Sequence, residues 1–312
     1  MKQDRRFRFG VQAAAADSST HWLAKVRAIE DNGYAMLGIS DHFNQQLAAV
    51  PAMAAAAVST TTLQIGATVL GNDFRHPAVL AKELATIDVL ADGRSFIGLG
   101  AGWLRSDYTE TGIAYDPAGI RIDRLQETVA VLKGLFADGP FSFQGNHYRI
   151  DALDSTPKPV QRPHPPIFIG GGGRRVLTFA AQQADIVGIN VDLRGGGLGD
   201  FAAGGSSSGP IDEKVTWIRE AAGERFADIE LNVCVFTALV TDDREGVARE
   251  VAARTGANTE VVLATPNVLL GTVDQIVETL QQRRDRYEIS NVMLPHSQLE
   301  QFAPVVERLA DR

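Results

Sequence analysis

Short apolar runs alternate with segments of helical period along nearly the whole chain, and this alternation limits the possible folds more than any other feature. Strands that are joined by helical crossovers must run parallel. Eight runs have the character of strands: residues 7–12, 36–40, 63–70, 95–100, 166–170, 186–190, 229–240 and 289–294. Eight strand–helix units predict an α/β protein with a closed (β/α)8 TIM barrel, because a doubly wound open sheet rarely has so many evenly alternating units.

Three segments between these runs carry clear helix signals. Residues 20–31 place apolar side chains every three or four positions, and Gly33 stands just past their end. Residues 117–136 repeat the same helical period. Thr272 and Gln275 have the spacing of a capping box and precede a further apolar face. We therefore expect helices at all three places.

The length of 312 residues suits one barrel, so we expect a single domain over residues 1–312 with two insertions. Residues 139–166 begin with two alternating runs around a Gln-Gly-Asn turn and continue into a proline-rich passage, which predicts a hairpin and an extended arm. Residues 193–210 are rich in glycine and serine. This tract is either a lid that orders over a ligand or a passive surface loop.

Charge and cysteine content exclude several classes of protein. Lys and Arg number 30 against 38 Asp and Glu, and the net charge of −8 argues against a general nucleic-acid or anionic-membrane surface. No apolar run approaches the roughly 18 residues of a membrane span, and no signal peptide is recognisable, so we expect a cytoplasmic protein. The single cysteine, Cys234, allows no internal disulfide, and we expect no metal site.

In a TIM barrel, reactive residues lie at the carboxyl ends of the strands and in the loops that follow. The second predicted strand ends in Asp41 and His42, a carboxylate next to an imidazole. One of them can bind a ligand while the other faces the reaction, although a helix cap beside an incidental histidine explains the pair equally well.

The third and fourth predicted strands end in small residues. Thr68 and Val69 lie in a stretch of small residues that lets a flat ring approach the backbone. The fourth strand gives Gly98, Gly100 and Gly102, followed by Trp103. The glycine spacing does not fit a Rossmann fingerprint. A bare backbone beside a large aromatic suits a planar ligand, but a packed tryptophan is the alternative.

The fifth predicted strand gives the sharpest local signal, because four glycines and two arginines precede a helical segment. Free backbone amides, the positive end of a helix and guanidinium groups together favour a bound phosphate. The alternative is merely a tight turn between strand and helix. The residues are Gly170, Gly171, Gly172, Gly173, Arg174 and Arg175.

Taken together, four motifs resemble those of a known family. They are GISDHF, ATVLGNDFRHPAVLAKELATIDVLADGR, GLGAGW and PKPVQRPHPPIFIGGGG. The chain resembles the bacterial-luciferase-like oxidoreductases over residues 7–189, and more narrowly their actinobacterial branch that uses the deazaflavin coenzyme F420. The later segment LLGTVDQIVETL is similar to the family's last barrel helix.

The resemblance implies a flavin or deazaflavin ring at the carboxyl face of the barrel. It places Asp41 against the ring and His42 on the substrate side as a candidate proton donor. Thr68 and Val69 correspond to a backbone bulge, often with a cis peptide bond, that supports the ring from behind. The resemblance also implies that Gly102 lines the ring edge and that the four consecutive glycines hold the phosphate.

One departure from the family bears on the substrate. The sugar-phosphate dehydrogenases of the family carry a glutamate where this chain has Trp103. We therefore expect a more apolar substrate than a sugar phosphate, in a pocket formed by Phe43, Phe74 and Trp103.

The resemblance thus implies an F420-dependent oxidoreductase that transfers a hydride between the deazaflavin and an organic small molecule, with Arg174 and Arg175 near the carboxylates of the cofactor tail. An FMN-dependent monooxygenase is the alternative in the same fold. Two further classes stay open: a barrel hydrolase that uses Asp41 with Asp73 or Asp192, and a non-catalytic carrier of a cofactor or ligand. The family resemblance also suggests a homodimer.

Overall fold

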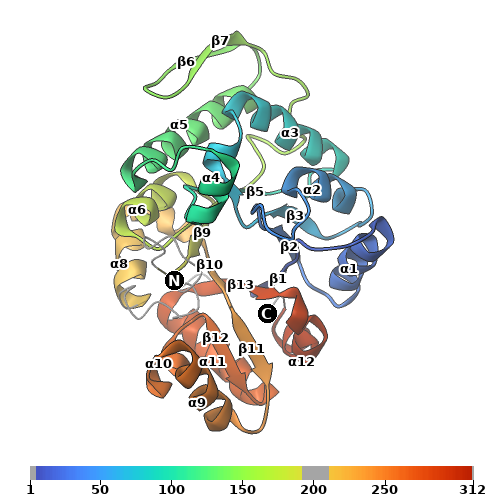
Figure 1. Ribbon diagram of the computed structural model, residues 1–312, viewed down its shortest axis with the longest axis vertical. Coiled ribbons are helices and arrows are strands. Elements are labelled where there is room, and N and C mark those ends of the chain that lie inside the picture. The colour runs from blue at the N-terminus through green and yellow to red at the C-terminus, as the bar shows by residue number, and fades with distance from the viewer. Residues whose placement is uncertain (1–4, 192–210, 311–312) are drawn as a thin grey trace.

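The computed structural model describes residues 5–191 and 211–310 and has the predicted (β/α)8 barrel at its centre (Figure 1). Nine short parallel strands form its wall. They are β1 (Arg8–Gln12), β2 (Met36–Ile39), β3 (Gln64–Ala67), β4 (Leu70–Gly71), β5 (Ile97–Gly100), β8 (Ile167–Gly171), β9 (Ile186–Ile189), β10 (Glu230–Cys234) and β13 (Ile289–Pro295). The predicted fold class is confirmed.

The barrel closes where the third predicted strand is interrupted. The strands follow the order β3-β2-β1-β13-β10-β9-β8-β5-β4, so β3 and β4 stand at the two ends of one sheet. Thr68 and Val69 separate these two strands in the chain, and Ile65 of β3 forms a parallel bridge to Ser95 just before β5. The predicted strand over residues 63–70 therefore supplies one barrel position in two pieces.

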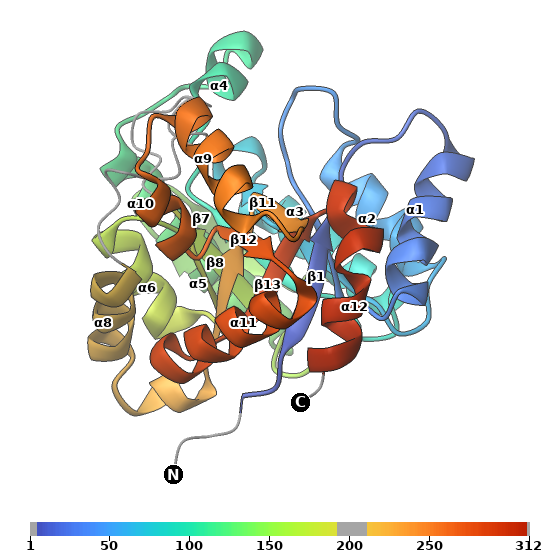
Figure 2. The ribbon, with the colours of Figure 1, turned by 90° about the horizontal axis from the view of Figure 1, so that it is seen from below.

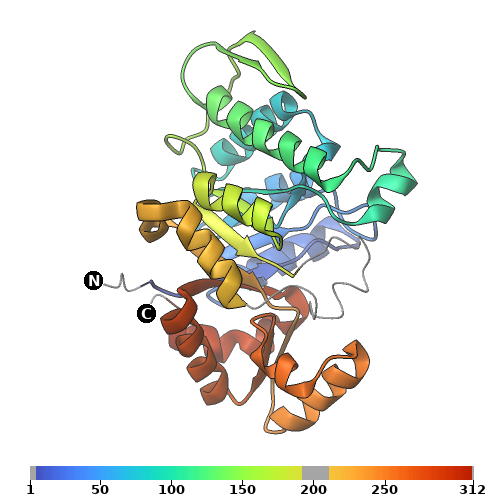
Figure 3. The same cartoon turned by 90° about the vertical axis from the view of Figure 1, so that its left-hand side faces the viewer.

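Helices surround the strands and bury them on the outside. They are α1 (Ser19–Asp31), α2 (Ala49–Ala57), α3 (Pro77–Leu90), α5 (Ala118–Phe136), α6 (Arg174–Gln183), α8 (Ile211–Ala222), α11 (Val273–Tyr287) and α12 (Leu299–Leu309). Figure 3 shows α6 and α8 packed side by side against the barrel. The three helices expected from the sequence are confirmed as α1, α5 and α11, and α11 begins with the predicted capping box of Thr272 and Gln275. None of the described helices is long and apolar enough to cross a membrane.

Large side chains fill the lower part of the barrel interior, whereas the part towards the carboxyl ends of the strands is open. Met36, Phe96, Phe168, Ile186 and Met293 form this inner cluster and are almost fully buried. Because these side chains occupy the lower part of the barrel, any ligand must bind above them, at the carboxyl end.

The prediction of one strand over residues 229–240 is wrong. The segment leaves the barrel after β10, and β11 (Thr237–Val240) pairs instead with β12 (Val268–Gly271) in a separate two-stranded sheet. The break occurs because the backbone amide of Phe236 bonds to the carbonyl of Asn267 at 2.8 Å, outside the barrel ladder.

The sequence also gave no indication of two helices in this insertion, α9 (Arg244–Thr255) and α10 (Thr259–Ala264). With β11 and β12 they enclose a small apolar cluster of their own. Figure 2 places α9 at the same end of the barrel as α4 (Arg105–Thr111), a short helix that was likewise not predicted.

The predicted hairpin is present as β6 (Phe141–Gln144) and β7 (Arg149–Leu153), which pair antiparallel and project beyond α5 (Figure 1). Its turn is fixed by Glu127, whose carboxylate accepts from three successive amides, those of residues 146–148, at 2.7–3.0 Å. The proline-rich arm is fastened by the buried Asp88, which accepts from the backbone and side chain of Gln161. The glycine- and serine-rich tract 193–210 lies outside the described residues.

Candidate active site

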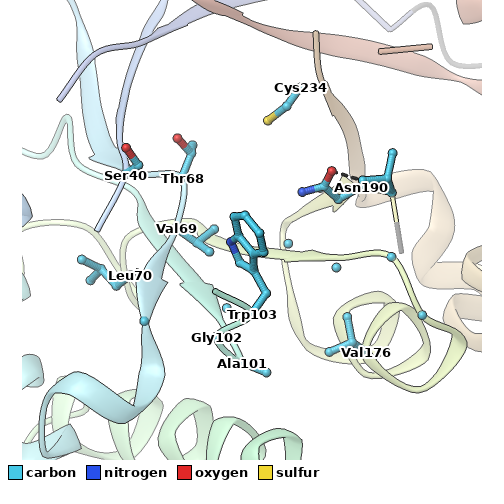
Figure 4. A pocket seen from close by; sticks show the side chains of 18 of the residues that line it. Ser40, Thr68, Val69, Leu70, Ala101, Gly102, Trp103, Val176, Asn190 and Cys234 are labelled. Carbon is cyan, nitrogen blue, oxygen red and sulfur yellow. Dashed lines mark hydrogen bonds between the residues drawn. The ribbon is translucent and has the colours of Figure 1, made fainter. Parts of the chain in front are cut away.

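A cavity of about 900 Å³ opens at the carboxyl ends of the barrel strands. Figure 4 shows Trp103 projecting into its middle, with Ser40 and Thr68 on one side and Asn190 on the opposite side. Of the residues that the sequence predicts for the site, all but Phe43 line this cavity. They are Asp41, His42, Thr68, Val69, Phe74, Gly102, Trp103, Gly170, Gly171, Gly172, Gly173, Arg174 and Arg175.

His42, just beyond β2, forms a close pair with Asp107 of α4. The Nδ1 atom of His42 lies 2.6 Å from Oδ2 of Asp107, and Oδ1 of the same carboxylate accepts from the backbone amide of Phe43 at 3.2 Å. The side chain of Asp107 is only 6% exposed, and that of His42 is 22% exposed. Because a carboxylate only accepts hydrogen bonds, His42 donates from Nδ1, and its Nε2 is left to exchange a proton with a bound molecule.

The loop that carries Trp103 is fixed from behind by Arg121 of α5. The buried guanidinium donates to the carbonyl of Ala101 at 3.1 Å and also bonds to the carbonyl of Gly102. Gly102 has a φ of 75°, and a Cβ atom there would collide with the hydroxyl of Tyr108. The turn therefore requires glycine, and these contacts hold Trp103 in the cavity.

The interruption between β3 and β4 forms the bulge implied by the family resemblance, and its Thr68-Val69 peptide bond is cis. The side-chain amide of Gln12 donates to the carbonyl of Thr68 at 3.1 Å and to its hydroxyl at 3.0 Å. The side chain of Val69 lies over Gly100, where a Cβ atom would overlap it. The glycine at the end of β5 therefore makes room for the bulge.

Asp41 lines the cavity, but its carboxylate is already paired. Its two oxygens lie 2.6 and 3.2 Å from the guanidinium nitrogens of Arg75, and Oδ2 also accepts from the amide of Gly71 at 3.1 Å. Although burial opposes it, the Asp41 carboxylate raises the pKa of Arg75. Asp41 thus fixes the backbone that follows the Thr68-Val69 bulge, a positioning role that the sequence did not indicate.

On the opposite side of the cavity, α6 begins directly after the four glycines. Its N-cap is Gly173, which has no side chain to accept from the amides of the first turn. A Cβ atom on Gly172 would overlap the carbonyl of Val191, whereas one on Gly173 would meet nothing within 4 Å. The glycine bay, residues 170–173, thus offers to the cavity a helix N-terminus without a side-chain cap, a feature that favours bound anions.

The two arginines after this bay are not equivalent. The guanidinium of Arg175 is already paired with α5, where it bonds to the carboxylate of Asp123 and donates to the carbonyl of Gly119 at 3.1 Å. Arg174 lies over the ring of Trp217 in α8, with 5.9 Å between the guanidinium carbon and the ring centre. Arg174 is therefore the better placed of the two to meet an anion at the cavity mouth.

The three predicted aromatic residues do not form one pocket wall, because Phe74 and Trp103 line the cavity and Phe43 does not. Phe43 is 55% exposed and packs edge-on against Phe74, with 5.1 Å between the ring centres. The ring of Trp103 meets that of His42 edge-on at 5.7 Å. Trp103 is therefore the aromatic side chain that stands beside the candidate proton donor.

The sequence did not single out Asp107 or Arg121, although both build the site. Their only signal is position: Asp107 follows Trp103 by four residues, on the same face if a helix begins after the fourth strand. Cys234 also lines the cavity, and burial raises the pKa of its thiol to about 12. A thiol held protonated in this way suits an apolar packing role rather than nucleophilic catalysis.

The site's combination of a bulged strand, a His–Asp pair and a glycine bay can be compared with known proteins. The profile of the luciferase-like monooxygenase family matches residues 6–305. The chain belongs to this family. The expected resemblance to luciferase-like oxidoreductases is thereby confirmed, over a longer stretch than the motifs covered.

The relatives of this luciferase-like chain include a monooxygenase and a reductase. An FMNH2-dependent dimethylsulfone monooxygenase of Pseudomonas putida is 32% identical over 195 residues, which are 62% of this chain and 49% of that protein. The chain thus spans about half the length of that relative. A 5,10-methylenetetrahydromethanopterin reductase of Methanopyrus kandleri is 24% identical over 283 residues, covering 86% of this chain and 74% of that protein.

A solved structure extends the comparison to the whole fold. The coenzyme F420-dependent tetrahydromethanopterin reductase from Methanopyrus kandleri superposes with a TM-score of 0.76 at 19% identity. The match covers 97% of this chain and 99% of that one. At this identity the likeness establishes the luciferase-like barrel and nothing finer.

Proposed function

We propose that the protein is an oxidoreductase that binds coenzyme F420 in the cavity and transfers a hydride between the deazaflavin and an organic small molecule. One observation carries this proposal: a single cavity has an uncapped helix N-terminus at one side and the His42–Asp107 pair at the other. The first suits a cofactor phosphate and the second suits proton transfer to a substrate.

The residues fit such a cofactor in size and chemistry. The space of about 900 Å³ is at the upper end of the range for a small-molecule site. Val69, Leu70 and Ala101 give it an apolar side for a flat ring, and the glycine bay leaves open space at Gly173 for a phosphate. These residues would hold the ring and the phosphate respectively.

The protein's own groups then have distinct tasks. The cofactor, when bound in its reduced form, supplies the hydride. His42 can donate a proton from Nε2 to the substrate when the ring is an imidazolium ion, whose Nδ1–H remains bonded to Asp107, and Asp107 thereby orients the ring. Trp103 fills the middle of the cavity, where it excludes water from the reacting groups (Figure 4).

An FMN-dependent monooxygenase is the second candidate, and it is supported by the 32% identity to the FMNH2-dependent enzyme. Two observations favour F420. The deazaflavin carries a tail of carboxylates, for which Arg174 provides a cation in the cavity lining. The proton donor beside Trp103 also suits the reduction of a substrate.

Titration of the purified protein with F420 and with FMN, followed by fluorescence, tests the order of the two candidates. We expect F420 to bind at least tenfold more tightly than FMN. Tight binding of FMN without affinity for F420 would reverse the order, and oxygen-dependent turnover with reduced FMN would establish the monooxygenase.

The hydrolase alternative finds no support among the described residues. Two of the three carboxylates considered for it are held by arginines: Asp41 by Arg75 at 2.6 Å, and Asp73 by Arg124 at 2.9 Å. Asp192, the other carboxylate considered, lies outside the described residues. A non-catalytic carrier predicts cofactor binding without turnover across a panel of enones and imines, and the same preparation tests it.

We also propose that the protein forms a homodimer. Helix α3 exposes the apolar side chains of Val79, Val89 and Leu90, which supports an interface on this helix. Sedimentation velocity at micromolar concentration should show a species of two chains. Sedimentation as a monomer alone would contradict the proposal.

A further inference from the structure

Three neighbouring strands place Gln12, Gly38 and Thr68 next to one another on the inner wall of the barrel. Gln12 ends β1 and pairs with Gly38 of β2, and Thr68 follows β3, the next strand in the sheet. A Cβ atom on Gly38 would lie 2.5 Å from the hydroxyl oxygen of Thr68 and 2.6 Å from its methyl carbon. The absence of a side chain at Gly38 therefore leaves the space in which Gln12 reaches across β2 to Thr68.

The side-chain amide of Gln12 has one possible orientation. It lies 3.1 Å from the backbone carbonyl of Thr68, which can only accept, so the nitrogen Nε2 and not the oxygen Oε1 must face that carbonyl. The same nitrogen lies 3.0 Å from the hydroxyl oxygen of Thr68. Because an amide nitrogen only donates, the hydroxyl is the acceptor in this second bond.

The hydroxyl of Thr68 therefore keeps its own hydrogen for another partner. A hydroxyl has one hydrogen and two lone pairs, and the bond from Gln12 uses only a lone pair. Among residues 5–191 and 211–310, no acceptor bonds to this hydrogen. Thr68 is half-buried and lines the cavity beside Val69 (Figure 4). This wall of the cavity thus offers a hydrogen-bond donor.

A ligand that covers this wall displaces water from the hydroxyl. The hydrogen then bonds to an acceptor atom of the ligand or is left unpaired, which is unfavourable in a partly buried place. Val69, Leu70 and Ala101 make the neighbouring wall apolar and suited to a flat ring. In a flat conjugated ring, the acceptor atoms are carbonyl oxygens and ring nitrogens. A ligand methyl group in the same place would leave the hydrogen unpaired.

We propose that Thr68 donates a hydrogen bond to a carbonyl oxygen or ring nitrogen of the bound cofactor, and that Gln12 is the residue that positions this hydroxyl. The inference rests on the proposed function, since it assigns the partner of the hydroxyl to the cofactor ring. The acceptor atoms of a conjugated ring gain electron density when the ring is reduced, and hydrogen bonds to more negative acceptors are stronger. The Gln12–Thr68 pair therefore stabilises the reduced cofactor more than the oxidised one.

Thr68→Val tests the hydroxyl, because valine has nearly the shape of threonine and lacks the donor. Thr68→Ser, which keeps the hydroxyl, is the matched control. Fluorescence titration gives the affinity for oxidised F420, and anaerobic competition with the oxidised form gives the affinity for reduced F420. We expect Thr68→Val to lower the ratio of reduced to oxidised affinity about tenfold, which is about 30 mV for a two-electron couple. Thr68→Ser should keep the ratio of the wild type.

Gln12→Met tests the positioning role. Methionine has a similar length but no hydrogen-bond donor, so the hydroxyl of Thr68 becomes free to turn. We expect this variant to lower the same ratio by about threefold, and to leave the ratio unchanged when Thr68 is already valine, because no hydroxyl is then left to position. A merely structural role for Gln12 predicts instead that the affinities for both forms fall equally, in either background.

An unchanged ratio in Thr68→Val, with F420 still bound, would overturn the inference and leave the proposed function intact. An equal fall of both affinities would also overturn it, since the hydroxyl would then not distinguish the two forms. If the wild type binds FMN instead of F420, the same ratio is measured with FMN, whose ring carries the same two carbonyl groups. Binding of neither cofactor would overturn both proposals, so the two failures are distinguishable.

Discussion

Asp107 reaches across from α4 to place its carboxylate oxygen 2.6 Å from Nδ1 of His42, although 65 residues separate them in the chain. The other oxygen of Asp107 accepts from the backbone amide of Phe43. Both oxygens thus meet hydrogen-bond donors on one short segment after β2. The imidazole is held in one tautomer, with its second nitrogen left for chemistry.

Removal of the imidazole tests its role directly. We expect His42→Ala to lower turnover by about 10²–10⁴-fold, the usual contribution of a general acid or base, with little change in cofactor affinity. Reoxidation of reduced F420 by 2-cyclohexenone, followed by absorbance, measures the rate, and fluorescence titration measures the affinity. An unchanged rate at saturating cofactor would remove His42 from the mechanism.

Asp107→Asn distinguishes a positioning role from a structural one. The amide of Phe43 is a fixed donor, so the new side chain must turn its oxygen there and its NH2 group towards His42. Nδ1 then has to accept, and the hydrogen of the neutral ring moves to Nε2. We expect turnover to fall by about 10²-fold.

The loss should fall on kcat, because Asp107 orients the group that transfers the proton. KM should change little, and Asp107→Glu should restore part of the rate. A merely structural role for Asp107 predicts instead a lower melting temperature, with a loss of rate that Asp107→Glu does not restore.

The parts of the site that sequence could predict are those where one short segment carries the signal. The glycine bay and its helix are consecutive in the chain, and Asp41 and His42 directly follow one strand. The predicted ends of the strands were therefore enough to find these residues. The partners of those residues come from other elements. Asp107 reaches His42, and Arg75 reaches Asp41, only through tertiary packing, which no local sequence pattern encodes.

The fold shows the same difference between local signals, which the sequence reveals, and long-range contacts, which it does not. Regular alternation was enough to predict a barrel, because each unit buries its strand under its own helix. The segment 235–272 departs from that pattern: β11 and β12 pair with each other outside the barrel and share a small core with α9 and α10. The pairing of β11 with β12 ends the barrel strand after β10, so the predicted strand over residues 229–240 is divided in two.

A substitution at the start of α6 separates phosphate binding from stability. Asp at an N-cap accepts from the first-turn amides and stabilises a helix by only about a few tenths of a kcal/mol relative to glycine. Gly173→Asp has room for its side chain, since a Cβ atom there meets nothing within 4 Å. The carboxylate would occupy the donors proposed for the phosphate and repel its charge.

We therefore expect Gly173→Asp to keep or raise the melting temperature while lowering cofactor affinity more than tenfold. Because the variant is at least as stable, lost binding cannot be ascribed to unfolding. Wild-type affinity in this variant would place the phosphate elsewhere. Thermal unfolding and fluorescence titration of one preparation give both values.

Glu30, at the end of α1, gives a prediction about stability and pH. Its Oε1 atom accepts from the amides of Thr61, Thr62 and Leu63 at 2.6–3.1 Å and so fastens the turn before β3. Although burial opposes it, the hydrogen bonds from Thr62 and Thr61 lower the pKa of Glu30 to about 2. The carboxylate is therefore stabilised by folding.

A lowered pKa contributes stability above the ordinary value of 4.5, and that contribution is lost as the pH falls towards 2. Glu30→Gln keeps an acceptor but no charge, so it should be less stable than the wild type at pH 7. Because the Glu30 side chain is only partly buried, we expect a difference of only about 1 kcal/mol. The difference should shrink between pH 4.5 and 2. Urea unfolding at pH 7 and pH 3 measures this difference in the free energy of unfolding, and Glu250→Gln at an exposed position is the control. A difference that does not depend on pH would show that the charge of Glu30 makes no contribution.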